Sequence, residues 1–274
     1  STFHSTEAFN QPLAWDTSKV PRMLSTFGNV LYAESFNRPL DWDTSRVETM
    51  WGTFYGADAF NSELNWDTSK VANMKYTFSD AEAFNSELAW DTSSVTTMDS
   101  TFYSADAFNE DIGAWDTSSV TTMEQMFYNA DAFNQPLSRW DVSSVTNMAY
   151  MFYDADAFNK DILGWDTFKV TDSYNIFYSA DAWHARFEGG GSSTLPDRGW
   201  TRRDDACDAS HSPFDGDVGT CTDTLASGTS CVPECLSGTK MKAGNAPAAT
   251  STRRTRIWPA SSVCLATGSD SPWV

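Results

Sequence analysis

Apolar residues recur at fixed intervals along the first two thirds of the chain. Trp followed by Asp occurs seven times, at spacings of 27, 24, 24, 25, 25 and 25 residues, with Val five and Phe twelve residues after each Trp. A Met lies eight residues after six of these tryptophans. A unit of this length cannot bury its own apolar face, so successive copies must stack. The tryptophans are Trp15, Trp42, Trp66, Trp90, Trp115, Trp140 and Trp165.

The lengths between these positions predict which parts of a repeat are rigid. Every Trp-to-Phe segment has the same length, whereas the differences fall just before each Trp and between Phe27 and Phe36. Variable lengths indicate loops, and the constant stretch indicates a packed coil segment. The VTTM sequences at 95–98 and 120–123, inside that stretch, predict a short β-strand, and residues 126–134, which extend beyond it, predict a helical or 3₁₀ return.

The predicted fold class is an α/β solenoid over residues 1–187. We expect about seven to eight right-handed, leucine-rich-repeat-like coils with one short parallel β-strand each. Parallel strands lie about 4.8 Å apart, so seven coils would form a rod of roughly 35 Å. The Phe, Leu, Trp, Val and Met side chains of successive copies would then stack as columns and form the core.

Charge is distributed unevenly along the 274 residues. Residues 1–188 carry 28 Asp and Glu against 10 Lys and Arg, a net charge of −18. An acidic body repels phosphate backbones and anionic lipids, so nucleic acids and membrane surfaces are disfavoured as partners. Cations, cationic partners or solubility remain as reasons for the charge. No run of 18 apolar residues occurs, and we expect no membrane span.

All five cysteines follow residue 206, which predicts a second, small domain. We expect a Gly, Ser and Pro-rich linker at 188–203, a small Cys-rich module at 204–239, and at 240–274 a basic tail that is disordered or a sequence artefact. Clustered cysteines favour disulfides and an oxidising, extracellular compartment. The cysteines are Cys207, Cys221, Cys231, Cys235 and Cys264; their pairing and the odd thiol stay open.

The segment FNQPLSRWDVSSVTNMAYMFYDA (133–155) resembles the repeat of BspA-like surface proteins, which are relatives of leucine-rich-repeat proteins. The resemblance covers residues 1–187. It implies a coil-stacking fold and a secreted or surface-attached protein for adhesion and partner binding, without family-wide catalytic residues. The segment at 207–235 resembles the start of a sushi-type module, although the closing aromatic and Gly pattern is missing. The chain begins inside a coil, so we expect a processed or truncated N-terminus.

Polar residues recur with the same period. The Asp after each Trp predicts either an Asx-turn that closes the corner before the strand or a row of calcium sites, and the lack of D-x-D-x-D spacing favours the turn. The Asn after each Phe predicts an inward ladder in which every Asn bonds its counterpart one coil away. A second acidic row accepts both Asp and Glu, which indicates an exposed face.

The positions nine and ten residues after each Trp vary most in their side chains. In a stack of coils, such positions line one continuous surface. Aromatic residues among them are typical of protein interfaces, and the alternative is a solvated face with occasional aromatics. The candidate partner-binding residues are Trp51, Lys75, Tyr76, Asp99, Glu124, Tyr150 and Tyr174. Threonines near the strand suggest ice binding only weakly, because Pro, Glu, Arg and Asp interrupt their array.

Repetition argues against an enzyme, because catalysis needs one unrepeated constellation. Histidine occurs at three positions, His4, His184 and His211, and no HExxH, GxSxG or phosphate loop is present. We expect no cofactor and no protein-bound metal site of the usual motifs. The predicted function is protein recognition, adhesion or scaffolding in an extracellular assembly, and the alternative is a calcium-dependent structural protein that uses the Asp rows.

Overall fold

The computed structural model describes residues 10–27 and 35–203 and, beyond them, the backbone of four two-residue strands. The chain divides into two compact units, Ser1–Arg203 and Asp204–Val274. In the first unit, helix α1 spans Asp181–Arg186, and strand β1 (Phe187–Glu188) pairs antiparallel with β2 (Thr201–Arg202).

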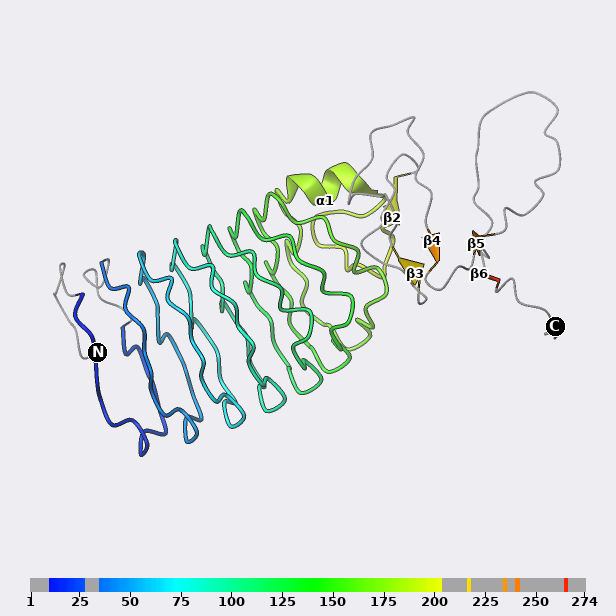
Figure 1. Ribbon diagram of the computed structural model, residues 1–274. Coiled ribbons are helices and arrows are strands. Elements are labelled where there is room, and N and C mark those ends of the chain that lie inside the picture. The colour runs from blue at the N-terminus through cyan, green and yellow to red at the C-terminus, as the bar shows by residue number, and fades with distance from the viewer. Residues whose placement is uncertain are drawn as a thin grey trace, which may run out of the picture. The chain divides into compact units, whose positions relative to one another are not determined.

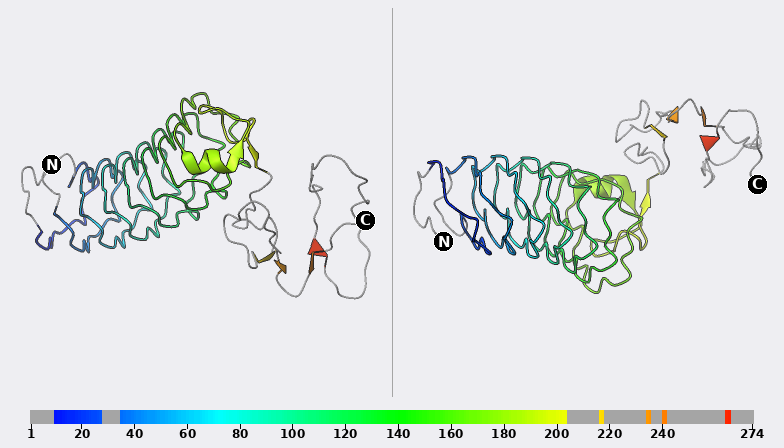
Figure 2. Two further views of the ribbon diagram at one scale, coloured as in Figure 1. Left: turned by 90° about the horizontal axis from the view of Figure 1, so that it is seen from above. Right: turned by 60° about the horizontal axis from the view of Figure 1, so that its bottom comes forward.

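Successive repeats lie side by side as coils, one repeat to a coil (Figure 1). Two further views show the same row of coils (Figure 2). We number the coils 1 to 7 by their Trp, from Trp15 to Trp165. Single parallel bridges join each coil to the next, and they are formed by Arg22, Thr49, Asn73, Thr97, Thr122, Asn147 and Asp172, seven residues after each Trp. The amides beside a bridge alternate in direction: Thr96 N–H donates to Ala72 O (2.9 Å), and Met98 N–H donates to Thr122 O (3.1 Å).

The strand expected at VTTM is shorter than predicted, because each coil contributes one bridge residue where several paired residues were expected. A turn precedes it, in which Val95 N–H donates to Thr92 O (2.9 Å). Two residues after Met98, the backbone of Ser100 has a φ of 51°, which no extended strand can accommodate. The pairing is parallel, as expected, but both neighbours of the bridge bend away from strand geometry.

The expected helical return at 126–134 is wrong, since these residues form successive turns. Ten and fourteen residues after Trp, the described backbone has φ between 44° and 67°, in the left-handed region. A right-handed helix requires negative φ at every residue, so these positions interrupt it twice in each coil. The second row consists of Gly56, Asp80, Ser104, Asn129, Asp154 and Ser179, which includes the residue types that tolerate this conformation best.

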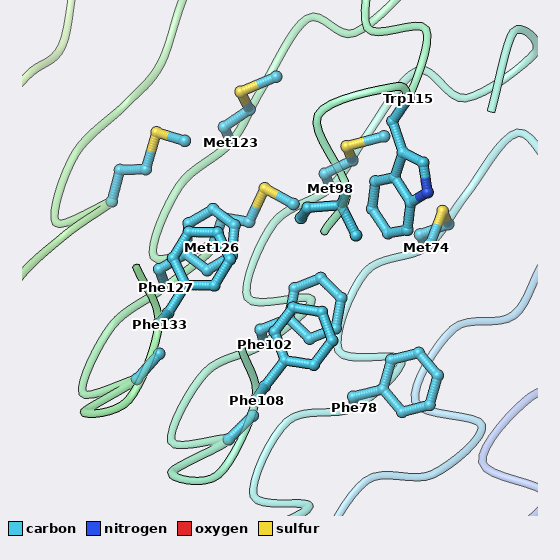
Figure 3. Packing of buried hydrophobic residues seen from close by; sticks show 14 of the residues in the cluster. Met74, Phe78, Met98, Phe102, Phe108, Trp115, Met123, Met126, Phe127 and Phe133 are labelled. Atoms are coloured by element: carbon cyan, nitrogen blue, oxygen red, sulfur yellow. The ribbon is translucent and has the colours of Figure 1, made fainter. Parts of the chain in front are cut away.

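Three columns of parallel aromatic rings form the core, and the predicted stacking of equivalent side chains is confirmed. Phe rings twelve residues after Trp are 5.3–5.7 Å apart between centroids, with planes within 9° of parallel. Rings of neighbouring columns also stack on each other, with centroids 3.9 Å apart for Phe102–Phe108 and 4.0 Å apart for Phe127–Phe133 (Figure 3). All four are fully buried. Such stacking adds to the free energy gained by removing the rings from water.

Polar ladders join the coils beside these columns. Each indole N–H from Trp42 onward donates to the carbonyl of the Leu or Ile before the preceding Trp, at 2.9–3.2 Å. From Asn10 to Asn134, each Asn Oδ1 of this row accepts the backbone N–H of the Asn one coil later, at 2.8–3.1 Å. The Asn ladder is therefore confirmed, but its inward placement is wrong. None of these side chains is fully buried: Asn37 and Asn61 are exposed, and the members from Asn85 onward are half-buried.

Residues 181–203 cover the end of coil 7. The ring of Trp183 stacks on Phe177 at 4.1 Å, whereas Trp200 meets both rings nearly at right angles (80° and 78°). The perpendicular indole ends the parallel columns, since it presents its edge where another ring face would follow. Trp183, Trp200 and Leu195 are buried in the same core as the coils.

The linker expected at 188–203 is instead part of the first unit. This segment forms the hydrogen bonds to coil 7 that the next coil would otherwise form. Phe177 N–H donates to Ser192 O (2.9 Å), and Thr167 Oγ1–H donates to Asp197 Oδ1, where earlier threonines of this row meet a backbone carbonyl. Ser173, which stands in the Met row, donates through Oγ to Ser193 O (2.8 Å). Gly and Ser allow the tight backbone path of this cap and so misled the prediction of a linker.

The second unit contains β3 (Gly216–Asp217) paired with β4 (Glu234–Cys235), and β5 (Lys240–Met241) paired with β6 (Cys264–Leu265), both antiparallel. The predictions of a Cys-rich module at 204–239 and a basic tail at 240–274 otherwise fall outside the described residues. So does the pairing of the cysteines.

Candidate recognition surface

The predicted partner-binding residues lie on the same edge of successive coils but differ in exposure. Tyr174 and Trp51 are exposed, at 57% and 39% of their surface. Four others are half-buried: Lys75, Tyr76, Glu124 and Tyr150. They share this edge because they follow the bridge residue of each coil by two or three positions.

Asp99 does not fit the predicted role of a free contact residue, because it is 8% exposed. Its carboxylate accepts hydrogen bonds from Thr122 Oγ1 (2.5 Å) and Glu124 N–H (3.1 Å) and pairs with Lys75 Nζ at 3.3 Å. These partners come from coils 3 and 5, on either side of Asp99. The position varies in sequence, yet here it serves to join three coils.

A row of tyrosines thirteen residues after Trp was missed by the sequence reasoning. It comprises Tyr55, Tyr103, Tyr128, Tyr153 and Tyr178, with Ser79 in coil 3. The sequence signal is the dipeptide Phe-Tyr, which recurs in five repeats, but the prediction assigned a role only to its Phe, as a core residue. Because neighbouring residues of a turn point in different directions, the Phe is buried while the Tyr reaches the surface.

These tyrosines and the aromatic members of the predicted set form two groups of contacting rings on the same edge, which together we call the tyrosine strip. Tyr128 stacks between Tyr103 (4.6 Å) and Tyr153 (4.5 Å), and Tyr153 stacks on Tyr178 (4.8 Å). Tyr150 meets Tyr153 and Tyr174 at 5.9 and 5.3 Å. Nearer the N-terminus, the strip continues as contacts of Tyr76 with Trp51 (5.9 Å) and Tyr55 (6.4 Å).

Equivalent rings lie closer together at the tyrosine strip than elsewhere in the coils. Between coils 4 and 5 the Trp rings are 6.4 Å apart, the Phe rings 5.7 Å and the Tyr rings 4.6 Å. Between coils 6 and 7 the corresponding distances are 6.4, 5.7 and 4.8 Å. Because a pure translation would move every equivalent ring by the same distance, neighbouring coils are related by a rotation as well as a translation. Equivalent side chains therefore lie closest together on the Tyr side and farthest apart on the Trp side.

Carboxylates flank the tyrosine strip. Partial burial, with Asp80 as the second cause, raises the pKa of Tyr103, and the same two causes raise the pKa of Tyr55. Burial and the neighbouring tyrosines raise the pKa of Tyr128, to which Asp154 also contributes. Burial raises the pKa of Asp106, reinforced by Asp131, Glu82 and Asp80. Within the described part of the chain, no ion pair engages Asp80, Asp106 or Asp154.

The Asp that follows each Trp forms the predicted Asx-turn. In coil 5, Asp116 Oδ1 accepts Ser118 N–H at 3.0 Å and Ser118 Oγ–H at 2.7 Å, and coils 1 to 4 and 6 repeat this arrangement. These bonds hold the pKa of the Asp116 carboxyl below its usual value. Residues 10–27 and 35–203 contain no group of three His, Cys, Asp or Glu side chains placed to hold a metal ion. Calcium binding stays a prediction.

The one described histidine, His184, bonds within the cap, where Nε2 lies 2.7 Å from Phe177 O. His4 and His211 fall outside the described residues. Among the residues that the structure covers, no helix has the length and apolar character of a membrane span.

The geometry defines a class: a repeat protein whose constant side chains build a stacked core and whose variable side chains share one edge. Two copies of the family described as "Mycoplasma protein of unknown function, DUF285" match residues 1–89 and 88–189. The chain belongs to this family. Neither a curated protein nor a solved structure matches it.

Proposed function

We propose that this protein is a non-catalytic, secreted or cell-surface repeat protein that recognises a protein partner, in adhesion or in scaffolding an extracellular assembly. Its repeats form a right-handed solenoid of the leucine-rich-repeat type and group with the BspA-like surface proteins that they resemble. The single observation that supports recognition most directly is the tyrosine strip. Tyrosine and tryptophan are enriched at the centres of protein interfaces, and here they gather along one edge of successive coils.

Architecture supports recognition over catalysis. A row of stacked coils offers the same backbone in every repeat, so binding energy is spread over many equivalent positions. The side chains that differ between coils, such as Trp51, Tyr150 and Tyr174, adjust that surface to one partner. The cysteines beyond residue 206 support an oxidising, extracellular location.

Photo-crosslinking from the strip tests this proposal. The full chain carries p-benzoylphenylalanine in place of Tyr174, and a matched protein carries it in place of Phe168, an aromatic that is 84% exposed outside the strip. Each is irradiated with an extract of cell-surface and matrix proteins. We expect a discrete crosslinked protein from position 174 only. Identical products from both positions, or no product from position 174, would contradict recognition by this face.

A further inference from the structure

In the column from Tyr103 to Tyr178, the two inner rings expose edges and hydroxyl groups rather than ring faces. Both faces of Tyr128 are covered, by Tyr103 at 4.6 Å with planes 10° apart and by Tyr153 at 4.5 Å with planes 1° apart. Tyr153 is covered in the same way on its other face by Tyr178. A sugar ring or a nucleobase would need a free face on which to stack. Between Tyr103 and Tyr178 the strip therefore suits a ligand that bonds to hydroxyl groups along a line.

Acidic side chains follow the same line. Asp80 N–H donates to Tyr103 O (2.7 Å) and Asp154 N–H donates to Tyr178 O (2.8 Å), so each aspartate lies beside a tyrosine of the next coil. Asp106 and Asp156 lie next to these carboxylates and to Asp131. Like charges this close repel one another, and burial adds to the cost of keeping Asp80 ionised. A ligand with positive charges at matching intervals would relieve both costs.

The spacing fits an extended polypeptide. The column from Tyr103 to Tyr178 advances in three steps of 4.5–4.8 Å. An extended chain advances about 3.3 Å per residue, so the column has room for roughly four to five residues in extended form. Alternate side chains of such a segment point to the same side, toward the row of carboxylates.

We propose that the tyrosine strip binds an extended, arginine-rich segment of a partner protein. Backbone groups of the segment bond to the hydroxyls of Tyr103, Tyr128 and Tyr153, and its guanidinium groups pair with Asp80 and Asp154. Arginine fits better than lysine, because its planar fork binds a carboxylate through two parallel bonds and packs against aromatic rings. This inference rests on the proposed function and names the chemistry of the partner.

Calorimetry on the full chain tests this inference with three probes. The first is a 12-residue peptide of alternating Arg and Ser, the second is the same peptide with Glu for Arg, and the third is a neutral β-glucan oligosaccharide. We expect only the arginine peptide to bind. The double variant Asp80→Asn with Asp154→Asn should weaken that binding about tenfold, which corresponds to about 1.4 kcal/mol. Asparagine preserves the shape of both side chains and tolerates their left-handed backbone.

The matched control separates a specific site from general attraction to an acidic protein. Asp91→Asn with Asp116→Asn removes the same charge from the Asx-turns, and this pair should weaken binding less than twofold. Tyr128→Leu should weaken binding while circular dichroism shows an unchanged fold. Equal losses in both double variants, or binding of the glucan alone, would overturn the inference. If the arginine peptide fails while position 174 still crosslinks a protein, recognition stands and only the basic segment is wrong.

Discussion

At the scale of single residues, the left-handed positions explain how the chain turns without helices. Fourteen residues after Trp, coil 5 has Asn129 with a φ of 54°, and other coils place Gly, Asp or Ser there. Short polar side chains tolerate this conformation because they bond locally to the backbone, and glycine tolerates it because it lacks Cβ. The choice of residue at this row is therefore dictated by backbone geometry and leaves little freedom for function.

Substitution of Asn129 tests this explanation. Asn129→Ala should destabilise the protein by about 1 kcal/mol, because alanine lacks local bonding and pays the full left-handed penalty. Asn129→Gly should change stability by less than about half as much as Asn129→Ala. Glycine adopts the left-handed backbone without strain, but this advantage is offset because glycine also makes the unfolded chain more flexible. Urea denaturation of both variants measures the difference. Equal stability of the alanine and glycine variants would show that the backbone at this position is not left-handed.

Two rows of aspartates differ in the direction of their pKa shifts. Hydrogen bonds from Ser118 lower the pKa of Asp116, whereas burial and neighbouring acids raise that of Asp106. The contribution of Asp116 to stability is complete above the unfolded value near 3.8 and is lost as the pH falls through its folded pKa. For Asp106 the favourable contribution exists at low pH and is lost as the pH rises through its folded pKa.

The two rows should therefore respond oppositely to neutralisation. At pH 7, Asp116→Asn should lower the free energy of unfolding by about 0.5 kcal/mol, because the bonds to Ser118 lose their ionic character. Asp106→Asn should raise the free energy of unfolding by about a few tenths of a kcal/mol, because it removes the repulsion from the neighbouring acids. Both effects are small because solvent screens these largely exposed carboxyl groups. Both differences should shrink as the pH falls below 4. Urea midpoints between pH 3 and 7 measure them, and a shared sign at pH 7 would refute the assignment.

At the scale of elements, the coil was predictable where side chains recur and unpredictable where the backbone decides. The stacking of the Trp and Phe columns followed from their fixed spacing, because apolar rows must find partners in the next copy. The expected helix near Met126 failed because apolar spacing does not reveal φ. The residues that end each turn, which are Gly, Asp, Ser or Asn, are the sequence signal for the left-handed φ at this row. The cap was mistaken for a linker, since Gly190 and its neighbours resemble a flexible segment in composition alone.

Gly190 is the critical residue of the cap. A Cβ atom at this position would lie 2.2 Å from the indole of Trp200, whereas at Gly191 it would meet nothing closer than 3.7 Å. Gly190→Ala should displace the buried Trp200 and destabilise the first unit by about 2 kcal/mol. Gly191→Ala should change stability by less than about 0.5 kcal/mol. Thermal unfolding, monitored by near-ultraviolet circular dichroism, compares the two variants. Equal effects would show that the indole of Trp200 does not pack against Gly190.

At the scale of the whole molecule, the first unit couples a constant interior to a variable edge. Equivalent rings of neighbouring coils lie closest together at the tyrosines, where the distance between ring centroids falls to 4.5 Å. Of this candidate site, the sequence predicted the positions nine and ten residues after Trp, including Trp51 and Tyr174. It did not predict that Asp99 would be buried, because its partners Lys75 and Thr122 come from two other coils. The column from Tyr103 to Tyr178 was not predicted, because the close approach of these rings is a property of the assembled coils.

The central claim is that successive repeats are joined, coil to coil, through their backbone amides. Hydrogen–deuterium exchange of the full chain, read at single residues, tests it most directly. In coil 4 the amides of Met98, Ser100, Phe102 and Ser104 donate to coil 5 at 2.7–3.1 Å. We predict that these amides and their equivalents in coils 3 to 6 exchange at least about a hundredfold more slowly than an unstructured peptide, because each must open a bond between coils. Exchange of these amides at the unstructured rate would contradict the account.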